Sequence, residues 1–166
     1  MDKYVIDGGR RLFGSVAMQS AKNSVLPLLA ASILTEKRVT IREAPNISDV
    51  ACMAQILREL GADVKFSGGC VTIDSADAYC HEIPSSLTRE LRSSVFMLGS
   101  LLSRFGRALI AYPGGCDIGL RPIDLHLTAL KRLGVTISER DGFIFCECAK
   151  LKGAEILLDF PSVGAT

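Results

Sequence analysis

The sequence predicts an α/β protein built from a repeated βαβαββ unit, in which helices alternate with strands and a hairpin closes the unit. Two observations carry this prediction. The same succession of helix-like and strand-like patterns occurs twice along the 166 residues. The composition, with 48% hydrophobic and 22% charged residues, is that of an ordinary globular chain. A chain of this size buries most of its apolar surface on folding, so it needs neither a metal nor a disulfide to be stable.

In the first unit, residues 21–35 predict a helix that is buried on all sides, because this segment is apolar nearly all round and Pro27 falls near the first turn. Residues 39–42 then predict a short strand. A second helix starts at a Ser48 cap, shows one apolar face and stops at Gly61. A closing hairpin follows, with arms over residues 62–66 and 70–74.

The second unit opens with a helix over residues 88–105, whose apolar side chains share one face and which Gly106 ends. Residues 108–112 are the matching strand. Pro122 stands at the first position of the next helix, where proline is favoured. Ile123, Leu127 and Leu130 are expected to face inward on this helix, and Gly134 stops it. Another hairpin follows, with arms over residues 135–139 and 143–148 and a turn at Asp141 and Gly142.

The segment between strand and helix is longer in the second unit. Pro45 and Pro113 follow the two strands, and Leu60 and Leu133 end the two helices, so the second separation is five residues longer (133 − 113 against 60 − 45). The additional residues fall in the glycine-rich run PGGCDIGLR. A loop insertion costs little and loops often carry function, so we interpret this loop as part of a functional site.

A third unit begins near the carboxyl end. Residues 151–166 repeat the pattern of residues 12–23, with a Leu-x-Gly start, an apolar strand and small residues where a helix would begin. An apolar strand without the helix that covers it is a poor natural end. We therefore expect the sequence to be a piece of a longer protein.

Charge and composition exclude several functions. Nineteen Lys and Arg against eighteen Asp and Glu give a net charge of +1, which argues against a nucleic-acid-binding or membrane-binding face. The longest uncharged apolar stretch, residues 23–35, is shorter than the roughly 20 residues that cross a bilayer. The charged N-terminus is unlike an export signal, so we expect a cytoplasmic protein with six reduced cysteines. The cysteine spacing fits no zinc site, and we expect neither metal nor cofactor.

The loop of residues 113–121 places Cys116 among three glycines. Glycines allow the backbone to approach a ligand closely and allow a loop to move. Arg121 and the helix that opens at Pro122 would stabilise a Cys116 thiolate and make it reactive. A glycine-rich loop with an incidental cysteine is the alternative interpretation.

Lys22 and Arg92 stand in corresponding helices of the two units. Lys22 is a cation at a helix start, where anions are favoured, and such a position can bind an anion together with the helix end. An exposed lysine and a surface ion pair are the simpler alternatives. His126 is expected to be a satisfied interface residue rather than a base. Together, Lys22, Arg92, Arg121 and the Cys116 thiol predict a site for a phosphorylated, anionic substrate.

Four stretches carry a family resemblance: SAKNSVLPLLAASIL, the RSS that starts at Arg92, PGGCDIGLRPIDLHL and the terminal DFPSVGAT. In order and over the whole chain they resemble the UDP-N-acetylglucosamine 1-carboxyvinyltransferases, also called UDP-N-acetylglucosamine enolpyruvyltransferases. The Gly-Gly-Cys-x-Ile-Gly and Arg-Pro-x-Asp-Leu-His signature is highly specific. The related enolpyruvyltransferase of aromatic amino-acid synthesis shares the repeat but not this cysteine loop.

The resemblance implies an inside-out α/β barrel enzyme of two lobes with three units each, of which this chain is the amino-terminal portion. Residues 1–20 would be strands that pack with the missing second lobe, and residues 21–166 would be two repeat units and the start of a third. The implied reaction transfers enolpyruvyl from phosphoenolpyruvate to the 3′-hydroxyl of UDP-N-acetylglucosamine, the first committed step of peptidoglycan synthesis. Both implied partners are small molecules, with no nucleic acid and no membrane insertion.

The resemblance also assigns roles to residues. Lys22 matches a phosphoenolpyruvate-binding lysine, and Asn23 matches a contact to the sugar nucleotide. Cys116 matches the general acid, which forms an adduct with phosphoenolpyruvate and is alkylated by fosfomycin. Arg92 and Arg121 match anion-binding arginines, and Lys22, Cys116 and Arg121 are the implied catalytic set. The uridine-binding segment is matched by Pro122, Ile123, Asp124 and Leu125, and the diphosphate contact by Ser162, Val163 and Gly164.

Three positions depart from the family pattern. Ser20 stands where glycine is common, Phe160 stands where some members have a phosphate-binding lysine, and the Asp117 carboxylate disfavours a thiolate beside it. Further catalytic residues of the family would lie beyond Thr166, so this portion alone is expected to be inactive. A non-catalytic sugar-nucleotide-binding or assembly module is the alternative function, and a thiol-redox protein is a third.

Overall fold

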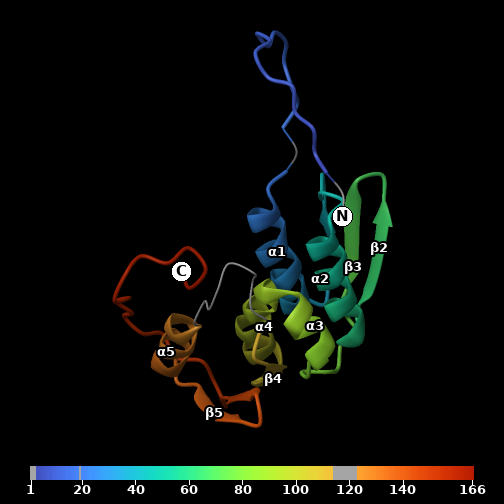
Figure 1. Ribbon diagram of the computed structural model, residues 1–166. Helices are drawn as coiled ribbons and strands as arrows, with labels where there is room; N and C mark the ends of the chain where they lie inside the picture. Colours follow the sequence, from blue (N-terminus) through green and yellow to red (C-terminus); the bar gives the residue numbers. More distant parts are fainter. Residues whose placement is uncertain (1–2, 19, 114–122) are drawn as a thin grey trace.

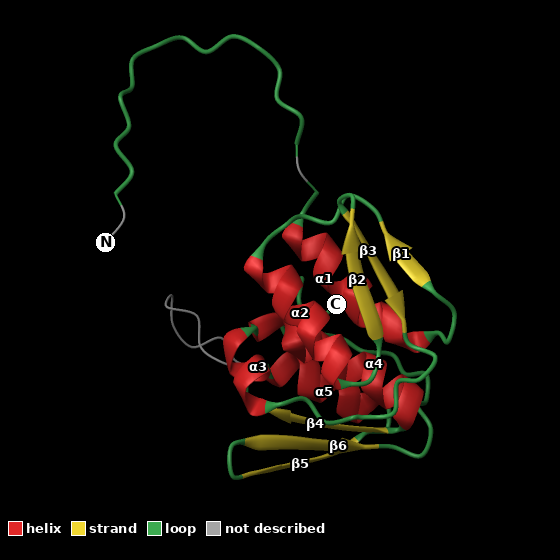
Figure 2. Cartoon of the chain, turned by 90° about the vertical axis from the view of Figure 1, so that its right-hand side faces the viewer, coloured by secondary structure: helices red, strands yellow, loops and turns green. Residues whose placement is uncertain are grey.

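The structure is a computed structural model that describes residues 3–18, 20–113 and 123–166. Its helices form a central layer, which two antiparallel sheets cover on different sides (Figures 1 and 2). Within the described residues each sheet has three strands, in the orders β1-β3-β2 and β4-β6-β5. The equal strand orders confirm the predicted repeat of one structural unit.

The first unit starts with α1 (Lys22–Ala31), which continues as a 3₁₀ helix over Ser32–Leu34. Leu26 and Leu29 are fully buried, whereas Leu28 and Leu34 are 52% and 53% exposed. The prediction of a helix buried on every side is therefore wrong. Apolar side chains project from all sides of the helix, but the described residues pack against only one of these sides.

The rest of the first unit follows the predicted order: β1 (Val39–Ile41), α2 (Ser48–Glu59), β2 (Asp63–Ser67) and β3 (Cys70–Asp74). Ile47, rather than Ser48, holds the N-cap position of α2, and no side chain caps this helix, so the predicted Ser48 cap is wrong. Gly61 follows the helix with a φ of +99°, a left-handed conformation that favours glycine. The predicted apolar face is confirmed, with Val50, Met53, Ile56, Leu57 and Leu60 at most 1% exposed.

The predicted helix over residues 88–105 is instead three elements: α3 (Ser85–Glu90), a 3₁₀ helix over Arg92–Val95, and α4 (Phe96–Phe105). Leu91 interrupts them in an extended conformation and is 3% exposed. The break lets α3 pack on α2 and β4 while α4 packs on α1. One straight helix could not reach both sets of partners, and periodicity along the sequence does not reveal this.

The second unit follows the predicted order, with β4 (Arg107–Ala111), α5 (Asp124–Arg132), β5 (Thr136–Arg140) and β6 (Phe143–Glu147). Because Ile123 holds the N-cap position of α5, the prediction that this helix begins at Pro122 is wrong. Gly106 ends α4 with a φ of +70°, and a Cβ there would lie 2.7 Å from the Cys148 carbonyl oxygen. Residues 81–83 run parallel to β4, because the Ile83 N–H donates to the Leu109 carbonyl and the Leu109 N–H to that of His81, both at 3.0 Å. This segment supplies the first strand-like element of the second βαβαββ unit.

Both ends of the chain lack regular structure. Residues 3–18 form no helix or strand and extend away from the body (Figures 1 and 2). Residues 151–158 form none either, contrary to the predicted strand, and the tail runs beside α5 in Figure 1. A strand needs a neighbour for its hydrogen bonds, and no described strand pairs with either segment.

The buried apolar side chains of both units form one continuous core. Cys52, Cys146 and Cys148 are buried in it, and the five cysteines that the structure describes are free thiols. None of the described helices is both long and apolar enough to span a membrane. Because α1, α4 and α5 all contribute side chains to this core, the core fixes the positions of these helices relative to one another. Several candidate residues lie at or near the N-terminal ends of these helices.

Candidate functional site

Seven residues that the resemblance implicates line two adjoining clefts. The first, which we call the α1 cleft, has a volume of about 680 Å³ and includes Asn23, Val163 and Gly164. The second, which we call the α5 cleft, has a volume of about 590 Å³. Its implicated residues are Arg92, Asp124, Leu125, Ser162 and again Gly164. The two clefts share four residues, Val95, Phe96, His126 and Gly164.

Lys22 is the first residue of α1, directly before Asn23. Its Nζ lies 2.6 Å from Oδ1 of Asp49, which is in the first turn of α2. The Lys22 side chain is 48% exposed. The predicted conflict between a cation and a helix N-terminus is therefore real, and a carboxylate from the neighbouring helix compensates it.

Arg92 owes its place to the break at Leu91. It begins the 3₁₀ helix that precedes α4, is half-buried, and lines the α5 cleft. Asp124 and Leu125 begin α5 on the same cleft. The first N–H groups of a helix have no partner within the helix, so this end offers donors to a ligand.

Ile123 differs from its neighbours in the implied uridine-binding segment. It holds the N-cap position of α5, and its side chain is 3% exposed within the core. Ile123 is therefore part of the core and is not among the residues that line the α5 cleft. The periodicity that predicted Ile123, Leu127 and Leu130 to face inward is confirmed.

The tail closes the clefts from the carboxyl side. Ser162 starts a turn in which its carbonyl accepts from the Thr166 N–H at 3.1 Å and its Oγ accepts from the Ala165 N–H at 3.3 Å. A Cβ on Gly164 would lie 3.5 Å from Nε2 of His126. The turn of residues 162–166 thus packs against the first part of α5.

His126 lies where the two clefts meet. Both ring nitrogens are buried, and they lie close to backbone groups of Gly164 and Ile123. Burial lowers the pKa of the imidazole, and the nearby Arg92 charge lowers that pKa further, while the backbones of Gly164 and Ile123 oppose the shift. The ring is therefore neutral near pH 7. The predicted interface position of His126 is confirmed.

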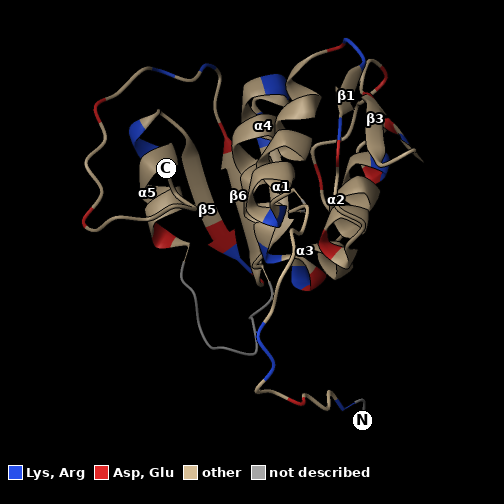
Figure 3. Ribbon diagram, turned by 90° about the horizontal axis from the view of Figure 1, so that it is seen from above, with Lys and Arg blue, Asp and Glu red and all other residues tan. Residues whose placement is uncertain are grey.

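Cys116, Arg121 and Pro122 lie outside the described residues, so the implied cysteine loop and two of the three implied catalytic residues are not part of this geometry. Among described residues, the α5 cleft holds the Arg92 guanidinium and two carboxylates, from Asp124 and Asp159. In the view of Figure 3, basic and acidic residues are interspersed along the described part of the chain. Recognition of an anion here would depend on local donors rather than on a broad field.

Sequence reasoning missed three residues of this region. Phe96 lines both clefts, Asp159 lines the α5 cleft, and Asp49 contacts Lys22. Phe96 follows the RSS motif directly, so proximity to that motif could have identified it. Asp49 and Lys22 are brought together only by the packing of α2 on α1, which no local pattern predicts.

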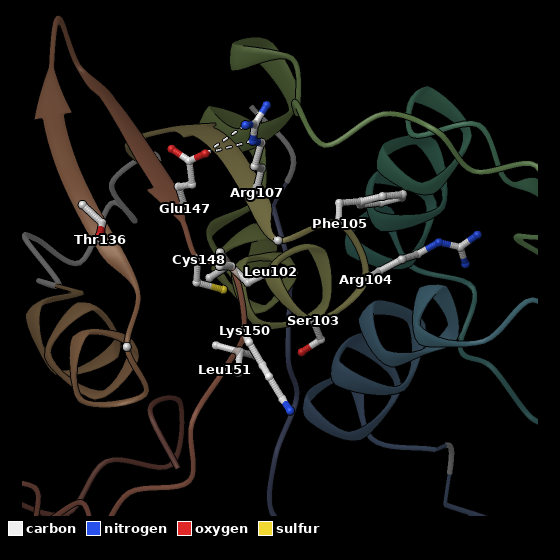
Figure 4. A pocket seen from close by; sticks show the side chains of 13 residues that line it. Leu102, Ser103, Arg104, Phe105, Arg107, Thr136, Glu147, Cys148, Lys150 and Leu151 are labelled. Carbon is white, nitrogen blue, oxygen red and sulfur yellow. Dashed lines mark hydrogen bonds and ion pairs between the residues drawn. The ribbon is translucent and has the colours of Figure 1, made fainter.

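A larger cleft, of about 960 Å³, lies at the opposite ends of α4 and α5 (Figure 4). It contains none of the implicated residues. The Arg107 Nη2 lies 3.0 Å from Oε1 of Glu147, so these two charges of the cleft neutralise each other. Size alone therefore does not mark the candidate site, which we place at the two clefts near the helix N-termini.

The repeated units define an α/β fold of the enolpyruvyltransferase type. The chain belongs to the EPSP synthase (3-phosphoshikimate 1-carboxyvinyltransferase) family, whose sequence profile matches residues 6–166. The enolpyruvyl transferase NikO from Streptomyces tendae has a similar structure, with a TM-score of 0.73 and 28% identity over 87% of this chain and 32% of that chain. This likeness confirms the expected fold.

Curated relatives are more similar in sequence. UDP-N-acetylglucosamine 1-carboxyvinyltransferase 2 of Caldanaerobacter subterraneus subsp. tengcongensis is 51% identical over 166 residues, which are all of this chain and 40% of the relative. UDP-N-acetylglucosamine 1-carboxyvinyltransferase of Lawsonia intracellularis is 42% identical, again over the whole chain and 40% of the relative. The chain thus spans about 40% of the length of the curated relatives it matches.

Proposed function

We propose that the chain is part of an enzyme that transfers the enolpyruvyl group of phosphoenolpyruvate to the 3′-hydroxyl of UDP-N-acetylglucosamine. The place of this step at the start of peptidoglycan synthesis, in the cytoplasm and in support of cell shape and division, belongs to the same proposal. One observation carries it. Segments around residues 23, 92, 124 and 163, far apart in sequence, all line two adjoining clefts. Unrelated surface positions would have no reason to converge in this way.

The chemistry fits the residues proposed to perform it. The donor's methylene carbon gains a proton, its C2 becomes an oxocarbenium-like centre, and the 3′-oxygen attacks that centre as the hydroxyl proton leaves. The former methylene carbon then loses a proton and phosphate departs, which restores the double bond. Lys22, Arg92 and Arg121 would hold anionic groups, and Cys116 would be the acid. The sugar nucleotide would occupy the clefts, with uridine near Asp124 and Leu125 and the diphosphate at residues 162–164.

The second lobe belongs to this proposal as a partner within the same longer chain. Residues 3–18 carry large apolar side chains that are almost fully exposed, including Tyr4 at 95% and Leu12 at 91%. Apolar segments of this kind need a surface to cover them. We therefore propose that residues 1–20 pack as strands against the second lobe, and that the chain without this lobe is inactive because further substrate-binding residues lie there.

Fosfomycin labelling of the full-length protein tests the proposal. We expect mass spectrometry to find the adduct on Cys116, and phosphate release to require both phosphoenolpyruvate and UDP-N-acetylglucosamine. Cys116→Ser should abolish most labelling. Cys52→Ser should leave it unchanged, because the Cys52 thiol is buried and burial raises its pKa to about 11.

The alternative functions give different results. A sugar-nucleotide-binding or assembly module would bind UDP-N-acetylglucosamine without releasing phosphate. A thiol-redox protein would form a stable disulfide that includes Cys116. Equal labelling of the Cys116→Ser and Cys52→Ser proteins would refute the assignment of Cys116.

A further inference from the structure

We propose that Asp49 is a positioning residue for Lys22, and that it holds the Lys22 ammonium where the phosphate group of the enolpyruvyl donor binds. This inference rests on the proposed function, in which Lys22 contacts that phosphate. It adds a residue that no sequence motif indicated. The juxtaposition that carries it is the 2.6 Å contact between Nζ of Lys22 and Oδ1 of Asp49 across two helix N-termini.

The two residues occupy equivalent places on packed helices. Lys22 is the first residue of α1, Asp49 is in the first turn of α2, and the two helices pack on each other. The first turn of α1 contains no acidic residue, so Asp49 is the carboxylate that offsets the Lys22 charge there. A carboxylate at the start of α2 is itself favoured by the dipole of that helix. Asp49 is thus held in place by its own helix.

Among the ion pairs of the described residues, this pair is the one that joins two helices. The Asp49 side chain is 28% exposed, close to the 34% of Asp74, whose contact with Arg38 is longer at 3.4 Å. The carboxylates paired with Lys65 and Arg107 are 59% and 65% exposed. Those two pairs lie on strands at the outside of the sheets. Exposed pairs of that kind contribute little to stability. A partly buried carboxylate fixed at a helix start restrains a flexible lysine more effectively.

The geometry leaves Lys22 able to bind an anion while it contacts Asp49. An ammonium has three N–H donors, and one contact with Asp49 leaves two for phosphate oxygens. The free side chain of a lysine would otherwise lose rotamer freedom when the ligand binds. Asp49 imposes that restraint before the ligand arrives, so its expected effect is on donor affinity more than on the chemical step.

Steady-state kinetics of the full-length enzyme test the inference. We expect Asp49→Ala to raise the donor KM roughly tenfold, because a charge-assisted contact is lost, and to leave the acceptor KM and kcat within about twofold. Asp49→Glu, which keeps the carboxylate, should restore part of the donor affinity. In a Lys22→Ala background the Asp49→Ala change should add nothing, because Asp49 acts through Lys22.

Asp63→Ala is the matched control. It removes the carboxylate of the Lys65–Asp63 pair, which has a similar contact distance of 2.5 Å but lies on the exposed strand β2 rather than at a helix N-terminus. Neither this pair nor the Lys22–Asp49 pair lines one of the two clefts. We expect its donor KM to equal that of the unchanged enzyme. A purely structural role for Asp49 would instead lower kcat and thermal stability and raise the KM of both substrates, and the effects of the Lys22 and Asp49 changes would add.

Binding of inorganic phosphate, measured by calorimetry, separates this inference from the proposed function. If the full-length protein transfers no enolpyruvyl group, the proposed function fails, and the Asp49 inference stands only if Asp49→Ala weakens phosphate binding in a Lys22-dependent way. Unchanged or absent phosphate binding would overturn it. Tighter binding after removal of Asp49 would also overturn it, because the carboxylate would then act by repulsion.

Discussion

Burial sets the chemistry of two described cysteines. Burial raises the pKa of the Cys52 thiol to about 11, with smaller contributions from the Glu90 and Asp49 charges. It raises the pKa of Cys146 to about 11 as well, with Glu139 and Cys148 adding to the effect. Both thiols are therefore protonated and poor nucleophiles at neutral pH. Cys148 is buried as well, whereas Cys70 and Cys80 are only partly buried.

These thiols predict a loss of stability in alkaline solution. An unfolded thiol ionises near its ordinary pKa of 9.0, whereas these two keep their protons to about pH 11 when folded. Between these values the folded state binds more protons than the unfolded state, so the free energy of unfolding falls as pH rises. Denaturant titrations at pH 8, 9, 10 and 11 measure the slope. Cys52→Ala should make the decline shallower, whereas Cys70→Ala, at a half-exposed site, should not. Equal slopes in all three proteins would contradict the argument.

Arg104 on α4 joins the two units. Its Nη1 donates to the Ile33 carbonyl at 2.7 Å and its Nη2 donates to the Ser75 carbonyl at 2.7 Å. Ser75 in turn donates from Oγ to the carbonyls of Ser32 and Thr35 at 3.1 and 3.0 Å. The last carbonyls of a helix lack partners within the helix, and a cation there also suits the helix dipole. Arg104 thus fixes the far end of the helix that carries Lys22.

Arg104→Met should lower the free energy of unfolding by about 2–4 kcal/mol, because it leaves partly buried carbonyls without their charged donor while keeping most of the side-chain volume. Urea denaturation of the chain measures this change. Arg107→Met is the control, since Arg107 pairs with Glu147 at an exposed site, with side chains 62% and 65% exposed. Its expected cost is less than about 1 kcal/mol. Similar losses in the free energy of unfolding for both substitutions would contradict the inference that Arg104 links the two units more strongly than an exposed ion pair does.

Sequence patterns predicted elements well where the signal is local. The apolar face of α2, the glycine after it and the turn at Asp141 and Gly142 depend on spacing and backbone conformation within a few residues. The helix break at Leu91 depends instead on which neighbours α3 and α4 reach, and the exposure of Leu28 depends on what covers α1. Both are properties of tertiary packing, which periodicity does not contain.

The candidate site was predictable to a similar extent. Motif resemblance indicated Asn23, Arg92 and the turn around Gly164, and the structure brings these together at the clefts. It could not indicate Asp49, because the contact with Lys22 arises from two helices packing side by side. The predicted role of Cys116 stays a prediction, since that residue lies outside the described part of the chain.

At the scale of the whole molecule, the described chain is a packed body with an extended apolar arm over residues 3–18 (Figure 2). The arm takes part in neither sheet. Its large apolar side chains are at least 84% exposed, whereas Leu26 in α1 is fully buried. Stability should therefore reside in the body, and the arm should determine how strongly the chain associates with other apolar surfaces.

Deletion of residues 1–18 tests this division. We expect the free energy of unfolding of the 166-residue chain to change by less than about 0.5 kcal/mol, because the arm buries almost no surface against the body. Binding of a hydrophobic dye and self-association in sedimentation should both decrease. Leu26→Ala, the control in the core, should cost about 2–5 kcal/mol, because it leaves a cavity. A deletion that destabilises the body as much as Leu26→Ala would mean that the arm packs on the body in solution. In a chain that also contains the second lobe, the same deletion should destabilise that lobe, since the exposed arm would there have become part of a sheet.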